Sequence, residues 1–227
     1  MANIYFTGDT HYSHANILKY SKRTLFMNKQ EREVMERNKE DEIKKLIISK
    51  ESVLKHNEGI IERFNSRVKK DDVCYINGDF SFKNGITGKE GEGLPIKYNE
   101  YAKRLNGNLI FVKGNHCKNN GINTRNHSII LKIGGINVYV VHDPKDAIIM
   151  DENGLYFPLN ITAHVHEAWL TKEIKNKKGL ISLCINCGVD QHKYFPISFD
   201  EVKAIYDQWY TKHPARKSIN KLIISKG

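Results

Sequence analysis

The amino-acid sequence predicts an α/β fold in which short apolar strands alternate with helices or long connections. Five β-type runs each end beside a side chain that can bind a metal, and three of these ends carry a glycine. In open α/β sheets, functional groups gather at the carboxyl ends of the strands. We therefore expect the five strand ends to converge on one site. The length of 227 residues suits one sizeable domain or two very small ones. We expect a single domain over residues 1–213 and a basic tail over residues 214–227.

The composition is that of a globular chain with anionic partners. Hydrophobic residues make up 40% of the chain. The sequence contains no run of about 18 apolar residues, which is the length that a transmembrane helix needs. The formal net charge of +10 at pH 7 suggests nucleotides, nucleic acid or another phosphate-rich partner. Most of the 36 basic residues are lysine, so the charge could instead reflect an AT-rich genome, and this alternative stays open.

The N-terminus and the cysteines indicate a cytoplasmic chain that needs no membrane and no obligate protein partner. A strand begins almost at once, without a basic region, a long apolar core or a cleavage site, so we expect no signal peptide. Four cysteines are too few for a disulfide scaffold. Without export, we expect them to be free thiols in a reducing compartment.

The first predicted strand runs from Ile4 to Thr7 and stops at Gly8, after which come Asp9 and His11. The last two side chains are spaced i, i+2, so an extended backbone would point them the same way. A carboxylate and an imidazole aimed at one place make half of a site for a borderline divalent ion.

Helices are expected after this strand. Residues 15–26 suggest a short helix or turn. Residues 29–67 have helical composition, with no proline, one glycine and an apolar stripe at roughly helical spacing. We expect His56 on a solvated or partly buried face of this segment and not as a ligand.

Four further strand ends carry residues that can bind a metal. They are Gly78-Asp79 after 73–77, Gly114-Asn115-His116 after 109–113, His142 after the hairpin 129–141, and His164-Val165-His166 after 160–163. Other segments complete the expected architecture. They are a glycine-rich flexible loop over 83–95, a helix over 96–105, an irregular stretch after 144, a strand over 180–187 and a last helix over 198–213.

Together these ends supply two carboxylates, one amide and four imidazoles. The set is Asp9, Asp79, Asn115, His11, His142, His164 and His166. It could hold two divalent ions if one carboxylate bridges them, and ligands without thiolate favour Mn, Fe, Ni or Zn over a cysteine-based zinc site. Two metals about 3.5–4 Å apart can clamp the attacking and leaving oxygens of a phosphoryl displacement. His116 then remains free for acid chemistry.

In this order, Gly8-Asp9-Thr10-His11, Gly78-Asp79, Gly114-Asn115-His116, His142 and His164-Val165-His166 resemble the motifs of calcineurin-like metallophosphoesterases. The resemblance spans residues 4–166. Residues 9–17, 105–108 and 186–190 are similar to the small phosphoesterases of bacteria and phages, which extends the match to Val202. The resemblance implies a four-layer α/β/β/α sandwich of two mixed sheets flanked by helices.

The resemblance also implies roles for the site residues. Asp9, His11 and His166 would bind the first metal, Asp79 would bridge, and Asn115, His142 and His164 would bind the second. His116 would protonate the leaving group or steady the transition state. Two divalent ions are expected, with Mn first and Fe, Ni or Zn as alternatives.

Two residues depart from the family pattern, and several others give weaker signals. Cys117 stands where the family usually has an acidic residue, and Ala163 stands where it usually has glycine. Alanine fits any backbone conformation that does not need positive φ. The pair Cys184 and Cys187 lacks the further ligands of a zinc site, and we expect no function for it. His14, Asn16 and Arg23 are candidate contacts for the phosphate or base of a substrate.

The leading hypothesis is a metal-dependent phosphoesterase that cleaves phosphodiesters of nucleotide-like or nucleic-acid substrates. A phosphomonoesterase or a protein phosphatase of the same chemistry is the alternative, although the chain is short and poor in arginine for that task. A catalytically dead scaffold is a third reading. A scaffold would be expected to have lost metal ligands or the His116 acid. This reading is disfavoured because the sequence keeps all of them.

Overall fold

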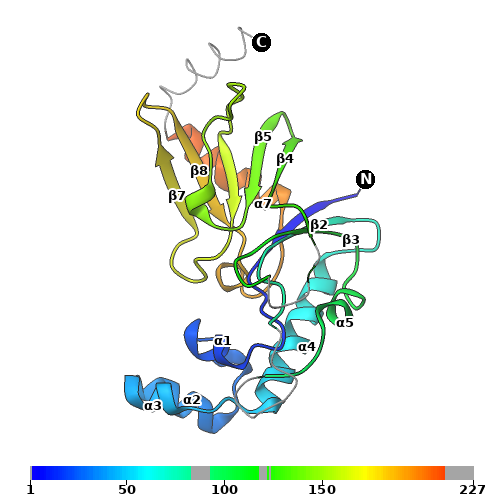
Figure 1. Cartoon of the computed structure of the whole chain (residues 1–227), viewed down its shortest axis with the longest axis vertical. Helices are drawn as coiled ribbons and strands as arrows, with labels where there is room; N and C mark the ends of the chain where they lie inside the picture. Colours follow the sequence, from blue (N-terminus) through cyan, green and yellow to red (C-terminus); the bar gives the residue numbers. More distant parts are fainter. Residues whose placement is uncertain (1, 83–92, 118–121, 123, 213–227) are drawn as a thin grey trace.

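The computed structural model describes residues 2–82, 93–117, 122 and 124–212 (Figure 1). Most of the predicted flexible loop 83–95 and all of the predicted tail 214–227 lie outside these residues. The α-helices are α1 (Ala15–Tyr20), α2 (Lys29–Arg37), α3 (Glu40–Lys45), α4 (Lys50–Arg67), α5 (Tyr98–Ala102) and α7 (Phe199–Thr211). Short 3₁₀ helices are η1 (Thr24–Phe26), η2 (Pro144–Asp146) and η3 (Val189–Gln191).

The strands form two sheets, which confirms the predicted α/β fold of two mixed sheets flanked by helices. One sheet has the order β3-β2-β1-β9 and the other β4-β5-β6-β8-β7. Their bounds are β1 (Ile4–Thr7), β2 (Val73–Asn77), β3 (Asn108–Val112), β4 (Ser128–Ile133), β5 (Ile136–Val141), β6 (Leu159–Thr162), β7 (Thr171–Lys175), β8 (Ile181–Asn186) and β9 (Ile197–Ser198).

The strands that carry predicted ligands run parallel inside each sheet. In the first sheet, β1 pairs parallel with β2, and β2 with β3. In the second, β5 pairs parallel with β6, and β6 with β8. A parallel bridge joins Gly8, just past β1, to Gly188, just past β8. The carboxyl ends of the parallel strands of both sheets therefore meet at one place. This is why potential metal ligands far apart in the sequence converge.

Residues 29–67 are helical as predicted, but they form three helices and not one continuous segment, because capping residues divide them. Asn38 adopts the left-handed conformation (φ 51°) and ends α2. The Ser49 side chain accepts a hydrogen bond from the Ser52 backbone N–H and starts α4. The Glu31 carboxylate also accepts from Ser49 N at 2.7 Å, which ties α2 to the start of α4. Composition predicts helix here but does not register these stops.

The remaining elements follow the predictions closely, apart from two strands that were missed. β7 is exposed along most of its length and rich in charged residues, so it lacks the apolar alternation that marks a strand. β9 has only two residues, Ile197 and Ser198, and pairs antiparallel with β1. No helix of the described part of the chain is long and apolar enough to cross a membrane.

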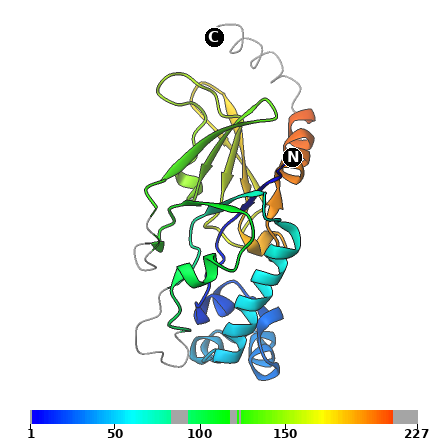
Figure 2. The same cartoon turned by 90° about the vertical axis from the view of Figure 1, so that its right-hand side faces the viewer.

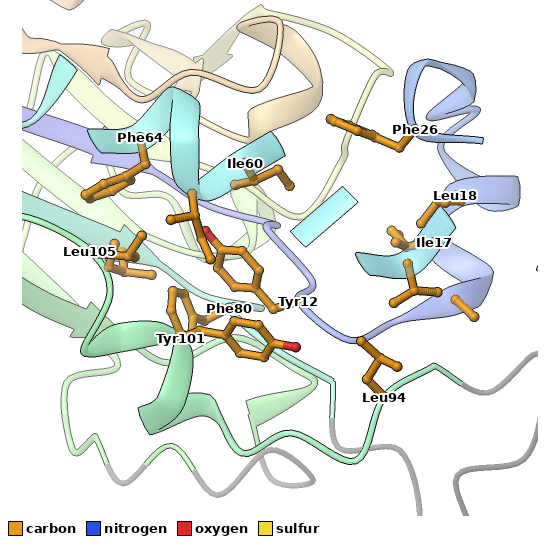
Figure 3. Close-up of a cluster of buried hydrophobic side chains, with 14 of the residues drawn as sticks. Tyr12, Ile17, Leu18, Phe26, Ile60, Phe64, Phe80, Leu94, Tyr101 and Leu105 are labelled. Atoms are coloured by element: carbon orange, nitrogen blue, oxygen red, sulfur yellow. The ribbon is translucent and has the colours of Figure 1, made fainter. Parts of the chain in front are cut away.

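One hydrophobic core lies between the first sheet and the helices that cover it. Side chains of α1, α4 and α5 pack there against Cys74 and Ile76 of β2. Figure 3 shows Tyr12 and Tyr101 among these side chains, and their rings stack with centroids 4.7 Å apart. Tyr12 directly follows His11, so packing of this core fixes the segment that carries the first predicted ligands.

A second core lies on the other face of the first sheet. It contains Phe6 of β1 and Tyr75 of β2, which stack at 5.4 Å, together with apolar residues of β5, β6 and β8. Phe199, Val202 and Tyr206 of α7 pack into the same cluster. Figure 2 shows α7 beside the N-terminus and the covering helices at the far end of the molecule. The two cores hold the sheets in fixed relation, and so position the loops that follow their strands.

Candidate metal centre

The structure brings Asp9, His11 and His166 together as a first triad. One potential ligand atom from each residue lies within 4.8 Å of the others. Asp9 and His11 follow β1, whereas His166 follows β6. Asp9 Oδ1 and His11 Nε2 are buried and have no hydrogen-bond partner among the described atoms. Buried polar atoms without a partner are costly, and a bound cation would satisfy both.

The backbone of these ligands differs from the expected extended geometry. Asp9 (φ 55°) and His11 (φ 49°) both adopt the left-handed region, so strand alternation is not what aims them at one place. The expectation of an extended i, i+2 pair is therefore wrong. Backbone hydrogen bonds hold the turn instead, from Asp9 N to Gly78 O at 3.2 Å and from His11 N to Asp79 O at 2.9 Å. Asp79, His164 and His166 also have positive φ. Such strain gathers at functional sites because it persists only where the surroundings impose it.

Asp79, His142 and His164 form a second triad with the same spacing. Asn115 lies beside it, with Oδ1 at 3.0 Å from His142 Nε2 and 3.1 Å from His164 Nδ1. The His-x-His pair is thus divided, because His164 joins the second triad and His166 the first. The seven predicted ligands all lie in or beside these two triads.

Asp79 belongs to the second triad and also faces the first. Its Oδ2 lies 3.7 Å from His11 Nε2 of the first triad and 3.4 Å from His142 Nε2 of the second. Its Oδ1 accepts a hydrogen bond from the His116 backbone N–H at 3.0 Å. This arrangement suits the bridging role that the sequence resemblance implies, and it leaves the His116 side chain outside both triads.

Glycines leave room for the carboxylates of both triads. A Cβ on Gly188 would lie 2.7 Å from Asp9 Oδ2, and a Cβ on Gly114 would lie 2.5 Å from Asp79 N and closer still to the Asp79 carboxylate. Neither distance is sterically allowed, so a side chain at either position would displace a ligand. Ala163 is not among the residues with positive φ, so the backbone at this position does not require the glycine that the family usually has.

The second triad places several electron-pair donors close together, where a cation would be well accommodated. His142 Nδ1–H donates to Asn77 O at 2.8 Å, so in a neutral ring Nε2 carries a lone pair. That lone pair faces oxygens of Asn115 and Asp79, which are also electron-pair donors. Burial lowers the pKa of His142, but the hydrogen bond with Asp79 and the charge of Asp9 outweigh it and raise the pKa to about 9. The raised pKa shows that these surroundings favour positive charge on His142, and a divalent cation could supply that charge instead.

Burial and neighbouring charges shift the pKa values of His11 and Asp9 in the first triad, and of Asp79 in the second, in different directions. Burial, aided by the charge of Arg23, lowers the pKa of His11 well below its usual range, so the ring is neutral and can donate a lone pair. Burial raises the pKa of Asp9, although His166 and His142 oppose that shift. Burial also tends to raise the pKa of Asp79, but its hydrogen bond with His142 and the charge of that ring lower it overall.

His14 orients His11. The two Nδ1 atoms lie 3.3 Å apart, so one must donate and the other accept. If His11 keeps its unpartnered Nε2 as a lone pair, its Nδ1–H donates to His14 Nδ1, and His14 carries its proton on Nε2. The His14 ring stacks on Phe82 at 4.1 Å, and burial lowers its pKa to about 3. Whether its Nε2–H reaches a substrate stays a prediction. The same holds for Asn16, which is partly exposed in α1.

The expectation that Arg23 contacts substrate is wrong. Its side chain is 0% exposed, and its guanidinium binds Asp190, His56 and the backbone carbonyls of Asp9 and Thr10. The expected position of His56 on a solvated or partly buried face is also wrong, because His56 is fully buried against Arg23. Sequence reasoning gave Asp190 no role, although it accepts a hydrogen bond from His166 Nδ1 at 2.8 Å. Its place after the strand end at Asn186 was the available signal.

The cysteines take no part in the triads. All four are free, as expected, and the structure shows that all four are buried. Cys117 Sγ accepts a hydrogen bond from Gly114 N at 3.0 Å, so the thiol closes the turn that carries Asn115 and His116. Burial raises the pKa of Cys184 to about 12 and raises that of Cys187 further, which makes both poor metal ligands or nucleophiles.

A cavity of about 680 Å³ opens beside the second triad. Asn115 and His142 form part of its wall, and Lys113, His127 and Tyr139 also line it. Asp143, Asp146 and Ser128 add to its polar lining. The cavity therefore offers a site for a substrate group next to the candidate ligands.

Comparisons with known proteins bear on the fold. No protein-family model matches the chain. The chain is 26% identical over 210 residues to an uncharacterized protein of Methanocaldococcus jannaschii, covering 92% of this chain and 93% of that protein. The structure of this chain is similar to that of a protein of unknown function from Aquifex aeolicus. The TM-score is 0.54 and the identity 22%, over 90% of this chain and 100% of the other.

Two further matches are more distant. Zinc-complexed Vps29 from Entamoeba histolytica gives a TM-score of 0.37 at 13% identity, over 82% of this chain and 73% of that one. The phosphoesterase YfcE from E. coli gives a TM-score of 0.36 at 14% identity, over 82% of this chain and 79% of that one. These scores carry no argument about activity. The chain shares its fold with the Aquifex protein, and that fold, two mixed sheets flanked by helices, is the one implied by its resemblance to the calcineurin-like metallophosphoesterases.

Proposed function

We propose that this chain is a metal-dependent phosphoesterase with a dinuclear centre, and that it prefers phosphodiesters of nucleotide-like or nucleic-acid substrates. The observation that carries the proposal is the pair of triads, with Asp79 of the second triad also facing His11 of the first. Asp9, His11 and His166 would hold one divalent ion, and His142, His164 and Asn115 the other, with Asp79 shared. The donors are oxygen and imidazole atoms, which suit Mn first and Fe, Ni or Zn as alternatives.

When bound, two such ions supply charge neutralisation at the phosphate and a nucleophile at neutral pH. The chain's own residues supply the rest. His116 is only partly buried, and its ring lies 5.7 Å from that of His11 by centroids, so it borders the centre without belonging to either triad. Its backbone N–H is fixed by Asp79 Oδ1. In this position its imidazole would donate a proton to the leaving oxygen of a phosphoester.

The preference for diesters is supported by the arginines. A monoester dianion carries an extra charge and profits most from an arginine aimed at the phosphate. Arg23 is buried with all its donors used, and Arg104 pairs with Glu58 on the surface. A diester carries one negative charge, which two divalent ions can neutralise without an arginine.

The leaving group of such a diester would lie in the cavity beside Asn115 and His142. Its volume of about 680 Å³ falls within the range of small-molecule sites, roughly 300–1,000 Å³. Tyr139, His127 and Lys113 line its wall, together with the carboxylates of Asp143 and Asp146. The net charge of +10 would draw in polyanions.

A hydrolysis panel with added Mn²⁺ tests the proposal. We expect a nitrophenyl diester to be cleaved with a higher kcat/KM than the matched monoester, and short nucleic acids to bind less tightly as salt rises. Cyclic nucleotides and nucleic acids complete the panel. Monoesters ahead by about tenfold, with salt-insensitive binding, would refute the diester preference. No hydrolysis of any ester by metal-loaded protein would refute the enzyme.

A further inference from the structure

A buried ion pair stands behind the first triad. Arg23 and Asp190 are 0% and 3% exposed in their side chains and lie 167 residues apart in the sequence. Arg23 Nε donates to Asp190 Oδ1 at 2.8 Å, and Arg23 Nη2 donates to Asp190 Oδ2 at 2.7 Å. Burying two charges is costly unless the pair is bidentate and fully hydrogen bonded. The Arg23–Asp190 pair is bidentate. Because a buried ion pair is weak evidence for a contribution to stability, we asked what else it holds in place.

Every donor of Arg23 is used. Besides Asp190, Nη2 donates to Asp9 O at 2.7 Å, and Nη1 donates to Thr10 O at 3.1 Å and to His56 Nε2 at 2.8 Å. Burial and the charge of Arg23 lower the pKa of His56, so its neutral ring accepts this bond. The guanidinium therefore binds the backbone carbonyls of Asp9 and Thr10, at the point where Asp9 adopts its left-handed conformation.

The other half of the pair acts on His166. Asp190 Oδ2 accepts the Nδ1–H of His166 at 2.8 Å, so in the neutral ring Nε2 is the atom that carries the lone pair. A carboxylate behind a histidine fixes the tautomer and the orientation of the ring and makes the imidazole a stronger ligand. His142 of the second triad is oriented differently, by the neutral backbone carbonyl of Asn77.

We propose that Arg23 and Asp190 are positioning residues of the first metal site: one buried guanidinium fixes Asp9 through its backbone and His166 through Asp190. The inference rests on the proposed dinuclear centre. It predicts that the pair tunes the first site selectively, because neither residue contacts a member of the second triad in the hydrogen bonds of the described chain.

The test is a calorimetric titration of the chelator-treated full chain with Mn²⁺, comparing Asp190→Asn with wild type. We expect wild type to bind two equivalents, and Asp190→Asn to weaken one of them by about 10- to 100-fold while sparing the other. Asp72→Asn is the matched control. Asp72 is also a buried carboxylate, but it binds Asn3 N and Lys69 N at the opposite end of the sheet. It should leave both equivalents unchanged.

A second measurement avoids any dependence on how the variant folds. In the Zn²⁺-loaded wild-type chain, nitrogen NMR of the His166 ring should show a protonated Nδ1 and a metal-bound Nε2. The opposite tautomer would overturn the inference. So would equal Mn²⁺ affinities in Asp190→Asn and wild type, or an equal loss at both equivalents, while the dinuclear centre itself survives. A wild-type chain that binds no metal would overturn the centre and this inference together.

Discussion

Replacing Gly114 with alanine should damage the metal centre without touching a ligand. The added Cβ would lie 2.5 Å from the backbone N of Asp79, against a practical minimum of 3.0 Å, and closer still to the Asp79 carboxylate. The backbone of Asp79 must therefore move by about 0.5 Å or the turn after β3 must shift by as much. Gly114 is not among the glycines with positive φ, so the clash is the main effect.

The size of the effect follows from this displacement. A misplacement of about 1 Å can lower a rate about 100-fold, so a shift of at least half that size predicts a loss of about 10- to 100-fold in kcat/KM. Because Asp79 faces both triads, both metal equivalents should bind less tightly. Overpacking should also lower the free energy of unfolding by about 1–3 kcal/mol.

The assay is Mn²⁺-dependent hydrolysis of a nitrophenyl diester, with metal content measured on the same preparation. Gly59→Ala is the control. Its Cβ would lie 2.6 Å from Phe26 Cε1, a clash of similar size inside the helical core and away from the triads. It should change stability but leave metal content and kcat/KM close to wild type. Wild-type rate and metal content in Gly114→Ala would refute the argument that this glycine makes room for Asp79.

Three further predictions concern the same centre. Asp79→Ala should lose more metal than any other single ligand change, because Asp79 faces both triads; unchanged metal content would contradict its bridging role. His116→Ala should keep its metals and lose about 10²–10⁴-fold in rate, with a smaller loss for nitrophenyl esters, whose leaving groups need less protonation; an equal loss across leaving groups would point to positioning instead. Metal affinity should rise with pH toward about 9, because burial lowers the pKa of His142 but Asp79 raises it overall to about 9, and a ligand must lose its proton before a metal binds. An affinity that is flat between pH 6 and 9 would contradict the combination of a raised pKa and a ligand role for His142.

The metal-free protein should show the reverse dependence of stability. The pKa of His142 is higher in the folded chain, about 9, than its ordinary value of 6.5. The proton shared with Asp79 therefore stabilises the fold fully below pH 6.5, and this contribution disappears as pH rises through 9. Metal binding removes the need for that proton, so the two effects oppose each other.

Local patterns in the sequence determined the strands, their ends and the ligand set. The run Val73–Asn77 is predicted with the bounds that the structure has, and polar residues after five runs identified the six members of the two triads and Asn115 beside them. These features are short-range, since a strand needs only a few apolar residues and its end needs only a glycine or a turn. The capping residues Asn38 and Ser49 were also present in the sequence, and they could have divided the long helical segment.

The tertiary structure alone decided how those residues combine. Nothing local indicates that His164 and His166, two residues apart, belong to different triads, or that Asp9 and His11 reach their site through left-handed turns. Arg23 has the sequence context of a surface residue, yet it is buried because Asp190, 167 residues later, meets it there. A side chain's burial and partners depend on which distant segments the sheets bring beside it. That information lies in the packing of the whole chain and not in any stretch of it.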